Sequence, residues 1–325
     1  MKKALTIVFS LLLALLVFSA GCGADENAAI SSNGSEVAGP YVIGISPLTT
    51  QLEYYVGYIE GIQRAARERG VQAVVVDSQW DAAKQEADIR AFIEDGVDAI
   101  VCSPVDPVTI REVLREAETA GIAVIVEMTY VEGVTPLVAT DQYAGGRLAG
   151  EYAGNWMRTH CEDVFEVAIL DFPYFKNIND RVAGFIDGIK STCPQAQIVA
   201  DVDAQAKMET ARAATLNILE DYPGVRCVFG VNDDSAKGAN AAFHALGLNT
   251  AYVCVVGFDA DEGCRRLIAG DEYIKASVAA DTDIIATVCI DTAIQKIKGE
   301  SLPDWVEVQG AQYLVTRKNA AKLDS

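Results

Sequence analysis

Residues 225–259 have the pattern of a strand, a helix and a second strand. Two apolar runs, residues 227–229 and 252–256, are too short for helices and are rich in β-branched and aromatic residues, as in strands buried on both faces. Between them, apolar residues recur at helical spacing, and Gly247 stands where a helix C-cap is expected. Such a unit joins two parallel strands by a right-handed crossover. The sequence therefore predicts a parallel α/β sheet.

Polar side chains stand where each of these two strands ends. Asn232 and Asp233 follow the first strand, and Asp259 follows the second. The carboxyl ends of parallel strands meet at the edge of the sheet where open α/β proteins bind ligands. Carboxylate and amide groups there suit a small polyhydroxylated molecule. Alternatively, Asp233 or Asp234 caps the helix that follows.

The segments FGVNDDSAKGANAAFHALG and VVGFD in this stretch resemble the periplasmic sugar-binding proteins of the ribose/galactose type. The effector domains of LacI-type repressors have the same fold. The resemblance extends over residues 41–314. It implies an α/β protein of the periplasmic binding protein type I fold, with two doubly wound, Rossmann-like domains of parallel sheet joined by a three-segment hinge.

The same resemblance implies that the chain crosses between the two lobes near Asp141, Asp281 and Gln312. The helix that follows Asp141 contains Gly145 and Gly146, which allow close packing, and Asp141 is expected to cap that helix or to belong to the hinge. The predicted first lobe is residues 40–140 with 282–312, and the predicted second lobe is residues 141–281 with 313–325.

The first residues of the chain form a targeting segment. Two lysines are followed by an apolar run over residues 5–18 and by the sequence Ser-Ala-Gly-Cys, which ends at Cys22. Small residues before a cysteine resemble a bacterial lipobox, although Ser19 stands where a leucine is typical. The sequence therefore predicts a lipoprotein signal peptide over residues 1–22, lipidation of Cys22 and a flexible tether over 23–39. An ordinary secretory signal or a short membrane anchor is the alternative.

Composition restricts the classes of function. The chain has 325 residues, enough for two domains, and its net charge of −20 argues against binding to nucleic acid or to an anionic membrane face. A transcription regulator of this fold would carry a helix-turn-helix where this chain carries the targeting segment. The sequence has no Ser-His-Asp set, metal-ligand spacing or glycine-rich phosphate loop. It predicts a binding protein and not an enzyme, with no cofactor and no metal.

Eight cysteines are present. Once Cys22 is lipidated an odd number remains, so at least one thiol is free if the others pair. Cys161 and Cys193, which both precede predicted strands, are the best candidates for a disulfide. Cysteines inside predicted strands or helices are expected to be small core residues: Cys102, Cys227, Cys254 and Cys289.

In the first lobe, the resemblance places ligand contacts in the loop and helix start after the first strand. Relatives carry aromatic residues there that stack on a sugar, and the matching residues are Tyr54 and Tyr55, with Gln51 nearby. One of the two tyrosines would alternatively pack against the core. Trp80, in the next crossover, is expected to be surface or hinge packing.

The sequence departs from the ribose-binding pattern after the fourth predicted strand. Relatives have Asp-Arg there, which grips sugar hydroxyls, but this chain has Met128-Thr129. The arginine is lost, and Glu127, just before, is the candidate for the acceptor role.

In the second lobe, Asn179 aligns with the arginine by which relatives bind the sugar, and Arg181 aligns with a more structural neighbour. Either could reach the cleft. Asp171, at a strand end, is a further candidate. Asp281 stands near a family ligand position. Asn232 and Asp259 complete the predicted ligand-binding set.

The resemblance implies an extracytoplasmic solute-binding component of an ABC importer, anchored to the bacterial membrane by the lipid on Cys22. It would bind a monosaccharide or polyol between its lobes, close around it and deliver it to permease and ATPase subunits. A partner receptor for a signalling sugar is an alternative to the permease.

A cationic solute, such as an amino sugar or an amine, is an alternative ligand. Several acidic residues could approach the cleft, and Arg181 is the nearest predicted cation, so a positive solute would pair with carboxylates that are costly to bury alone. These acidic residues are Glu53, Glu127, Asp171, Asp233, Asp259 and Asp281.

Overall fold

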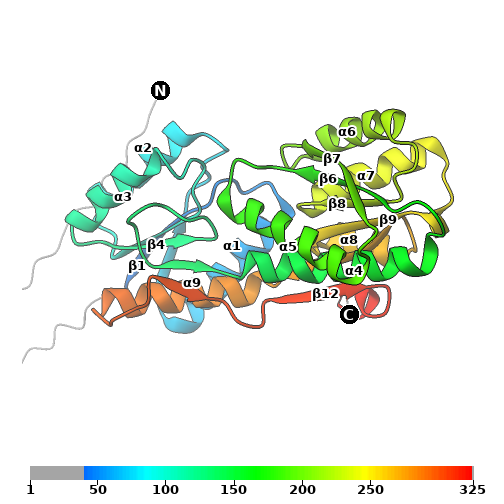
Figure 1. Ribbon diagram of the computed structural model, residues 1–325. Helices are drawn as coiled ribbons and strands as arrows, with labels where there is room; N and C mark the ends of the chain where they lie inside the picture. The colour runs from blue at the N-terminus through cyan, green and yellow to red at the C-terminus, as the bar shows by residue number, and fades with distance from the viewer. Residues whose placement is uncertain (1–39, 324–325) are drawn as a thin grey trace, which may run out of the picture. The chain divides into compact units, whose positions relative to one another are not determined.

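The computed structural model describes residues 40–323, and the predicted signal peptide, Cys22 and tether lie outside the described residues. The described chain forms two six-stranded sheets with helices on both faces of each (Figure 1). Each sheet and its helices form one α/β lobe, so the predicted fold class is confirmed.

The first sheet has the strand order β11-β5-β4-β3-β1-β2, and all its neighbouring strands are parallel. One face is covered by α1 and α9, which pack together, and the other by α2 and α3. Its strands are β1 (Val42–Ser46), β2 (Gln72–Val75), β3 (Ala99–Cys102), β4 (Ala123–Glu127), β5 (Leu137–Ala139) and β11 (Trp305–Glu307). Its helices are α1 (Glu53–Arg69), α2 (Ala82–Asp95), α3 (Ile110–Thr119) and α9 (Thr282–Ile297).

The second sheet has the strand order β12-β10-β9-β8-β6-β7, and only β12 runs antiparallel to its neighbour. The pair α6 and α7 covers one face, and the pair α4 and α5 lies on the other (Figure 1). Its strands are β6 (Glu166–Asp171), β7 (Gln197–Asp203), β8 (Cys227–Gly230), β9 (Cys254–Asp259), β10 (Ile274–Ala280) and β12 (Gln312–Thr316). Its helices are α4 (Gln142–His160), α5 (Lys176–Thr192), α6 (Met208–Asp221), α7 (Asp233–Leu246) and α8 (Glu262–Ala269).

Helix ends follow the caps that the sequence provides. The side chain of Asp81 accepts a hydrogen bond from the backbone N–H of Lys84 at the start of α2, and that of Asp141 does the same for Ala144 at the start of α4. Gly96 ends α2 with a φ of +68°, a conformation that glycine adopts without strain. The cap predicted at Asp141 is therefore confirmed.

The close packing of α4 against α5 depends on glycine. A Cβ atom on Gly146 would overlap the backbone carbonyl of Arg181. The two helix backbones can approach this closely only because that Cβ is absent. This close packing determines where Arg181, on α5, lies relative to the sheet.

The chain passes between the lobes at three places. It leaves the first sheet after β5 and continues as α4, and it returns from β10 to α9. The last passage runs from β11 to β12.

Residues 305–316 contribute to both sheets. That segment forms two strands in different sheets, β11 and β12, separated by a turn at Gln309 and Gly310. Gly310 has a φ of +77°, which breaks the extended run.

The strand predicted from Tyr252 begins two residues later, at Cys254. Tyr252 belongs to the short 3₁₀ helix η1 (Thr250–Tyr252), because the side chain of Asn249 accepts from the N–H of Ala251 and closes the turn.

The predicted pairing of Cys161 with Cys193 is wrong, since both thiols are free. Each residue is instead the C-cap of its helix, and its backbone N–H donates to the preceding turn. The other prediction for cysteine is confirmed: Cys102, Cys227, Cys254 and Cys289 are buried in the core.

Candidate functional site

A cavity of about 90 Å³ lies at the carboxyl ends of strands from both sheets. Leu48 and Met128 reach it from beyond β1 and β4 of the first sheet. Phe172 and Val231 reach it from beyond β6 and β8 of the second sheet, and Asp259 from the end of β9. We call it the central cavity. Ligand sites in open α/β sheets occur at this edge.

Arg181 is the cation of the central cavity. It is 3% exposed, and its Nε and Nη2 atoms donate to Gln142 Oε1 at 3.0 and 2.6 Å. Its Nη1 atom donates to the backbone carbonyl of Val231. Burial lowers the pKa of Arg181 to about 10, so the side chain keeps its charge at neutral pH. The guanidinium is therefore held in place before any ligand arrives.

Asp259, the last residue of β9, is the carboxylate of the central cavity. Burial raises its pKa to about 7, although the charge of Arg181 acts in the opposite direction. Asp259 is thus a hydrogen-bond acceptor whose ionisation is poised near neutral pH.

The central cavity gathers unusual backbone conformations. Four of its lining residues are not glycine yet have positive φ: Trp80 at 60°, Met128 at 61°, Ala206 at 53° and Asp259 at 110°. Such residues cost conformational energy and cluster where a protein holds a ligand or a reacting group. Their concentration here supports the choice of this cavity as the functional site.

Tyr54 and Tyr55 both line the central cavity, and both are buried. The hydroxyl of Tyr54 donates to Glu127 Oε1 at 3.0 Å. Packing against the core, the alternative for one of the two tyrosines, applies to both, because Tyr54 and Tyr55 also belong to the buried hydrophobic core. Glu127 does not line the central cavity but a smaller one of about 10 Å³ beside it, which Arg181 and Asp259 also reach. Burial raises the pKa of Glu127 to about 7.

Asn232 lines the central cavity and is also the N-cap of α7. Its Oδ1 atom accepts from the N–H of Ser235 at 2.9 Å, and its Nδ2 atom donates to the carbonyl of Ala206 at 3.1 Å. The alternative that Asp233 or Asp234 caps this helix is wrong, because both lie inside it.

Besides Glu127, three more residues of the predicted ligand-binding set do not line the central cavity. Gln51 is exposed in the loop before α1. Asn179 is exposed on α5, and its side chain donates to the carbonyl of Pro173 at 3.2 Å. Asp281 caps α9 by accepting from the N–H groups of Asp283 and Ile284 at 3.1 and 3.2 Å.

Several lining residues were missed by the sequence analysis. Asn177 reaches the central cavity in place of Asn179, because residues four apart share one helix face and Asn177 therefore lies on the side of Arg181. Phe172 and Phe175 form walls from the loop after β6. Trp80, expected at the surface or in hinge packing, is 41% exposed and also lines the cavity. The aromatic residues in the loop directly after a predicted strand were the available signal.

Most of the six acidic residues that the sequence placed near the cleft do not line the central cavity. Of the six, only Asp259 lines the central cavity. Asp233 is buried elsewhere, where it accepts from Ser277 Oγ and from the N–H of Asp261, each at 2.7 Å. Glu53 and Asp281 line a neighbouring cavity, whose wall includes Tyr54 and Asp259 of the central cavity. The charges at the central cavity are therefore one arginine and one aspartate.

Within residues 40–323 there is no cluster of three histidine, cysteine, aspartate or glutamate residues that could hold a metal ion. In the same range, every helix is too short or too polar to cross a membrane.

Comparison with known proteins agrees with this fold. Residues 43–301 match the family described as the periplasmic binding protein domain. The ribose import binding protein of Bacillus subtilis is 27% identical over 305 residues, which cover 93% of this chain and 95% of that protein.

Two solved structures are also similar. An ABC transporter solute-binding protein from Mycobacterium smegmatis with bound glycerol is 28% identical, covering 88% of this chain and 98% of that one, with a TM-score of 0.79. The Caulobacter myo-inositol binding protein bound to myo-inositol is 25% identical, and the match covers 86% of this chain and 95% of that one, with a TM-score of 0.77.

Proposed function

Because this chain belongs to the periplasmic binding protein family, we propose that it is the extracytoplasmic solute-binding component of an ABC importer and binds a neutral monosaccharide or polyol. The observation that carries the proposal is that Arg181 and Asp259 line the same small, aromatic-walled cavity. A fixed donor fork and a carboxylate acceptor satisfy hydroxyl groups from both sides. The similar proteins from three bacteria are described as binding ribose, glycerol and myo-inositol, all neutral polyhydroxylated molecules.

The size of the central cavity also favours a small solute. Pockets for drug-sized ligands have volumes of about 300–1,000 Å³. The central cavity, at about 90 Å³, is far smaller. A monosaccharide ring or a polyol suits such a space, with ring faces against the aromatic walls and hydroxyls towards Arg181, Asn177 and Asp259.

A cationic ligand is the weaker alternative. It would be attracted by Asp259 but repelled by the buried guanidinium of Arg181, which lines the same cavity. A neutral ligand meets no such repulsion.

We propose that binding is coupled to movement of the two lobes, with residues 40–140 and 282–312 in one and 141–281 and 313–325 in the other. The ligand touches both lobes, so it stabilises the closed arrangement over an open one. A contact between the lobes supports this: Glu53 Oε1 of α1 accepts from the N–H of Gly263 in α8 at 3.3 Å.

The remaining parts of the proposal concern the membrane. Cys22 is the lipidated residue, residues 23–39 are the tether, and the closed protein docks on permease and ATPase subunits. A receptor for a signalling sugar is the alternative partner. We propose no catalytic role.

A thermal-shift screen with monosaccharides, polyols, nucleosides and amines tests the proposed ligand class. We expect one or a few neutral sugars or polyols to raise Tm, because a ligand that binds only the folded state stabilises it by mass action. A response confined to amines or nucleosides would contradict the proposal.

A further inference from the structure

A second and larger cavity adjoins the central cavity. Its volume is about 320 Å³, against about 90 Å³ for the central cavity. Met128 and Asn177 line both, so the two cavities share a wall. We call the larger one the outer cavity. Nothing in the proposed binding of one sugar ring uses it.

Aromatic side chains from both lobes line the outer cavity. Tyr130 and Trp305 come from the first lobe and Tyr143 from α4 of the second, and they are 53%, 46% and 38% exposed. Large aromatic residues are seldom left this open without a purpose when they gather in one hollow. Trp305 is also fixed in place, because its Nε1 atom donates to the carbonyl of Ala139 at 3.2 Å.

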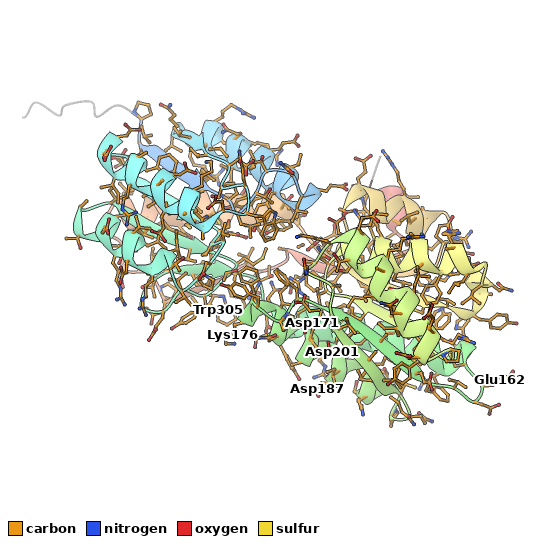
Figure 2. All side chains as sticks on the ribbon, turned by 90° about the horizontal axis from the view of Figure 1, so that it is seen from above. Glu162, Asp171, Lys176, Asp187, Asp201 and Trp305 are labelled. Atoms are coloured by element: carbon orange, nitrogen blue, oxygen red, sulfur yellow. The ribbon has the colours of Figure 1, made fainter. Side chains whose placement is uncertain are left out.

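Polar groups lie opposite these rings. Lys176, at the start of α5, pairs with Asp180 at 2.6 Å, and both line the outer cavity. Figure 2 shows Lys176 close to Trp305, although the two residues belong to different lobes. The positive charge of Lys176 is balanced by its neighbour, so the lining offers hydrogen bonds without an excess of positive charge.

Asn177 lines both cavities, and the oxygen of its side-chain amide has no hydrogen-bond partner among the described residues. Its side chain is buried, being 8% exposed, yet among the described residues no group donates to its Oδ1 atom. Buried polar atoms of folded proteins are almost always hydrogen-bonded. A hydroxyl group of a ligand that passes from one cavity into the other would supply the missing donor.

We propose that the outer cavity is a second carbohydrate subsite, which takes the second ring of a disaccharide or glycoside whose first ring lies in the central cavity. This rests on the proposed function, since it needs a sugar in the central cavity. Exposed aromatic faces beside paired polar groups are the chemistry that recognises a sugar ring, which has an apolar face and hydroxyl edges.

Calorimetric titration tests the second subsite. Each monosaccharide or polyol that binds is compared with its methyl glycoside and with a disaccharide that carries it, such as myo-inositol with galactosyl-myo-inositol or D-glucose with maltose. We expect the disaccharide to bind at least as tightly as the free sugar. The substitution Trp305→Ala should weaken the disaccharide about tenfold and leave the free sugar unchanged.

Two further variants serve as controls. Trp305→Phe keeps a ring and should restore most of the disaccharide affinity. Tyr252→Ala removes an aromatic side chain that is 59% exposed and lines neither cavity, and it should change nothing.

The outcomes separate the two proposals. If a free sugar binds but every glycoside is rejected, or if Trp305→Ala leaves disaccharide affinity intact, the second subsite is wrong and the proposed function stands. If no sugar or polyol binds at all, both are wrong.

Discussion

The guanidinium carbon of Arg181 lies 3.6 Å from the centre of the Phe258 ring. Phe258 directly precedes Asp259 in β9, so one strand end supplies both the aromatic platform and the carboxylate that accompany this cation. A cation stacked on a ring and hydrogen-bonded to Gln142 has little freedom left. The donor fork of the central cavity is therefore preorganised, which reduces the entropy lost when a ligand binds.

Replacing Arg181 by lysine should weaken sugar binding about 10- to 150-fold, which corresponds to the loss of one charge-assisted hydrogen bond. The charge remains, but the planar fork that reaches Gln142 and the cavity together is lost. Titration calorimetry measures the effect. The matched control is Arg226→Lys, on an arginine that lines neither cavity and donates to the carbonyls of Pro223 and Val225. An Arg181→Lys protein with unchanged affinity would contradict the assigned role.

Ligand affinity should depend on pH through Asp259. The ionised carboxylate is the form that accepts sugar hydroxyls, and its pKa is about 7 in the unliganded protein. Ligand affinity is therefore highest at pH values well above 7, where the carboxyl is ionised. Below pH 7 the affinity falls as the carboxyl becomes protonated, by up to about tenfold per pH unit. Titrations across this range measure the slope.

The variant Asp259→Asn identifies the group responsible. Asparagine has nearly the same shape as the aspartate that already holds a φ of 110° at this position, so the backbone is retained. The affinity of the Asp259→Asn protein for the ligand should be low and nearly constant with pH. If the variant keeps the wild-type pH slope, another group controls it, and Glu127 is then the first to examine.

Replacing Glu127 by glutamine should change stability in a pH-dependent way. The folded-state pKa of about 7 lies above the ordinary value of 4.5, so between these values the folded protein holds a proton that the unfolded chain has lost. The free energy of unfolding therefore decreases as pH rises through this window, by an amount on the order of 3 kcal/mol for this group. Thermal melts at several pH values check whether Glu127→Gln removes that decrease. Identical pH profiles for the two proteins would show that Glu127 does not titrate as argued.

Adding a methyl group at Gly146 should destabilise the second lobe and weaken binding together. The new Cβ would overlap the carbonyl of Arg181, so α5 must move away from α4 and carry Arg181 with it. Overpacking of this kind costs about 1–3 kcal/mol. Gly263→Ala is the control, since its nearest neighbour would be 3.5 Å away. Melting curves and calorimetry should show both losses for Gly146→Ala and neither for the control.

The sequence predicted the fold well because the relevant signals are local. Short apolar runs form the strands, Asp141 caps the start of α4 and Gly247 ends α7, and each of these signals acts within its own segment. The prediction also identified Asn232 and Asp259 as strand-end residues at the cavity, since parallel strands present their ends at one edge.

The parts of the site that the sequence did not predict depend on the direction in which each side chain points. Asp281 is at a strand end, but its side chain turns to cap α9, and the sequence does not distinguish capping from ligand binding. Asn179 and Arg181 are two residues apart, so a helix points them to different faces, and only Arg181 reaches the cavity. Trp80 reaches the central cavity through a turn with positive φ, and no local sequence pattern predicts that turn.

The central claim is that Arg181 and Asp259 bind a neutral sugar or polyol between the two lobes. Titration calorimetry of the wild type, Arg181→Lys and Asp259→Asn against neutral sugars, polyols and amines tests it most directly. We predict one-site binding of a neutral sugar or polyol by the wild type, insensitive to added salt and strongly weakened in both variants. Binding of amines alone with a strong salt dependence, or sugar binding unaffected by either substitution, would contradict the claim.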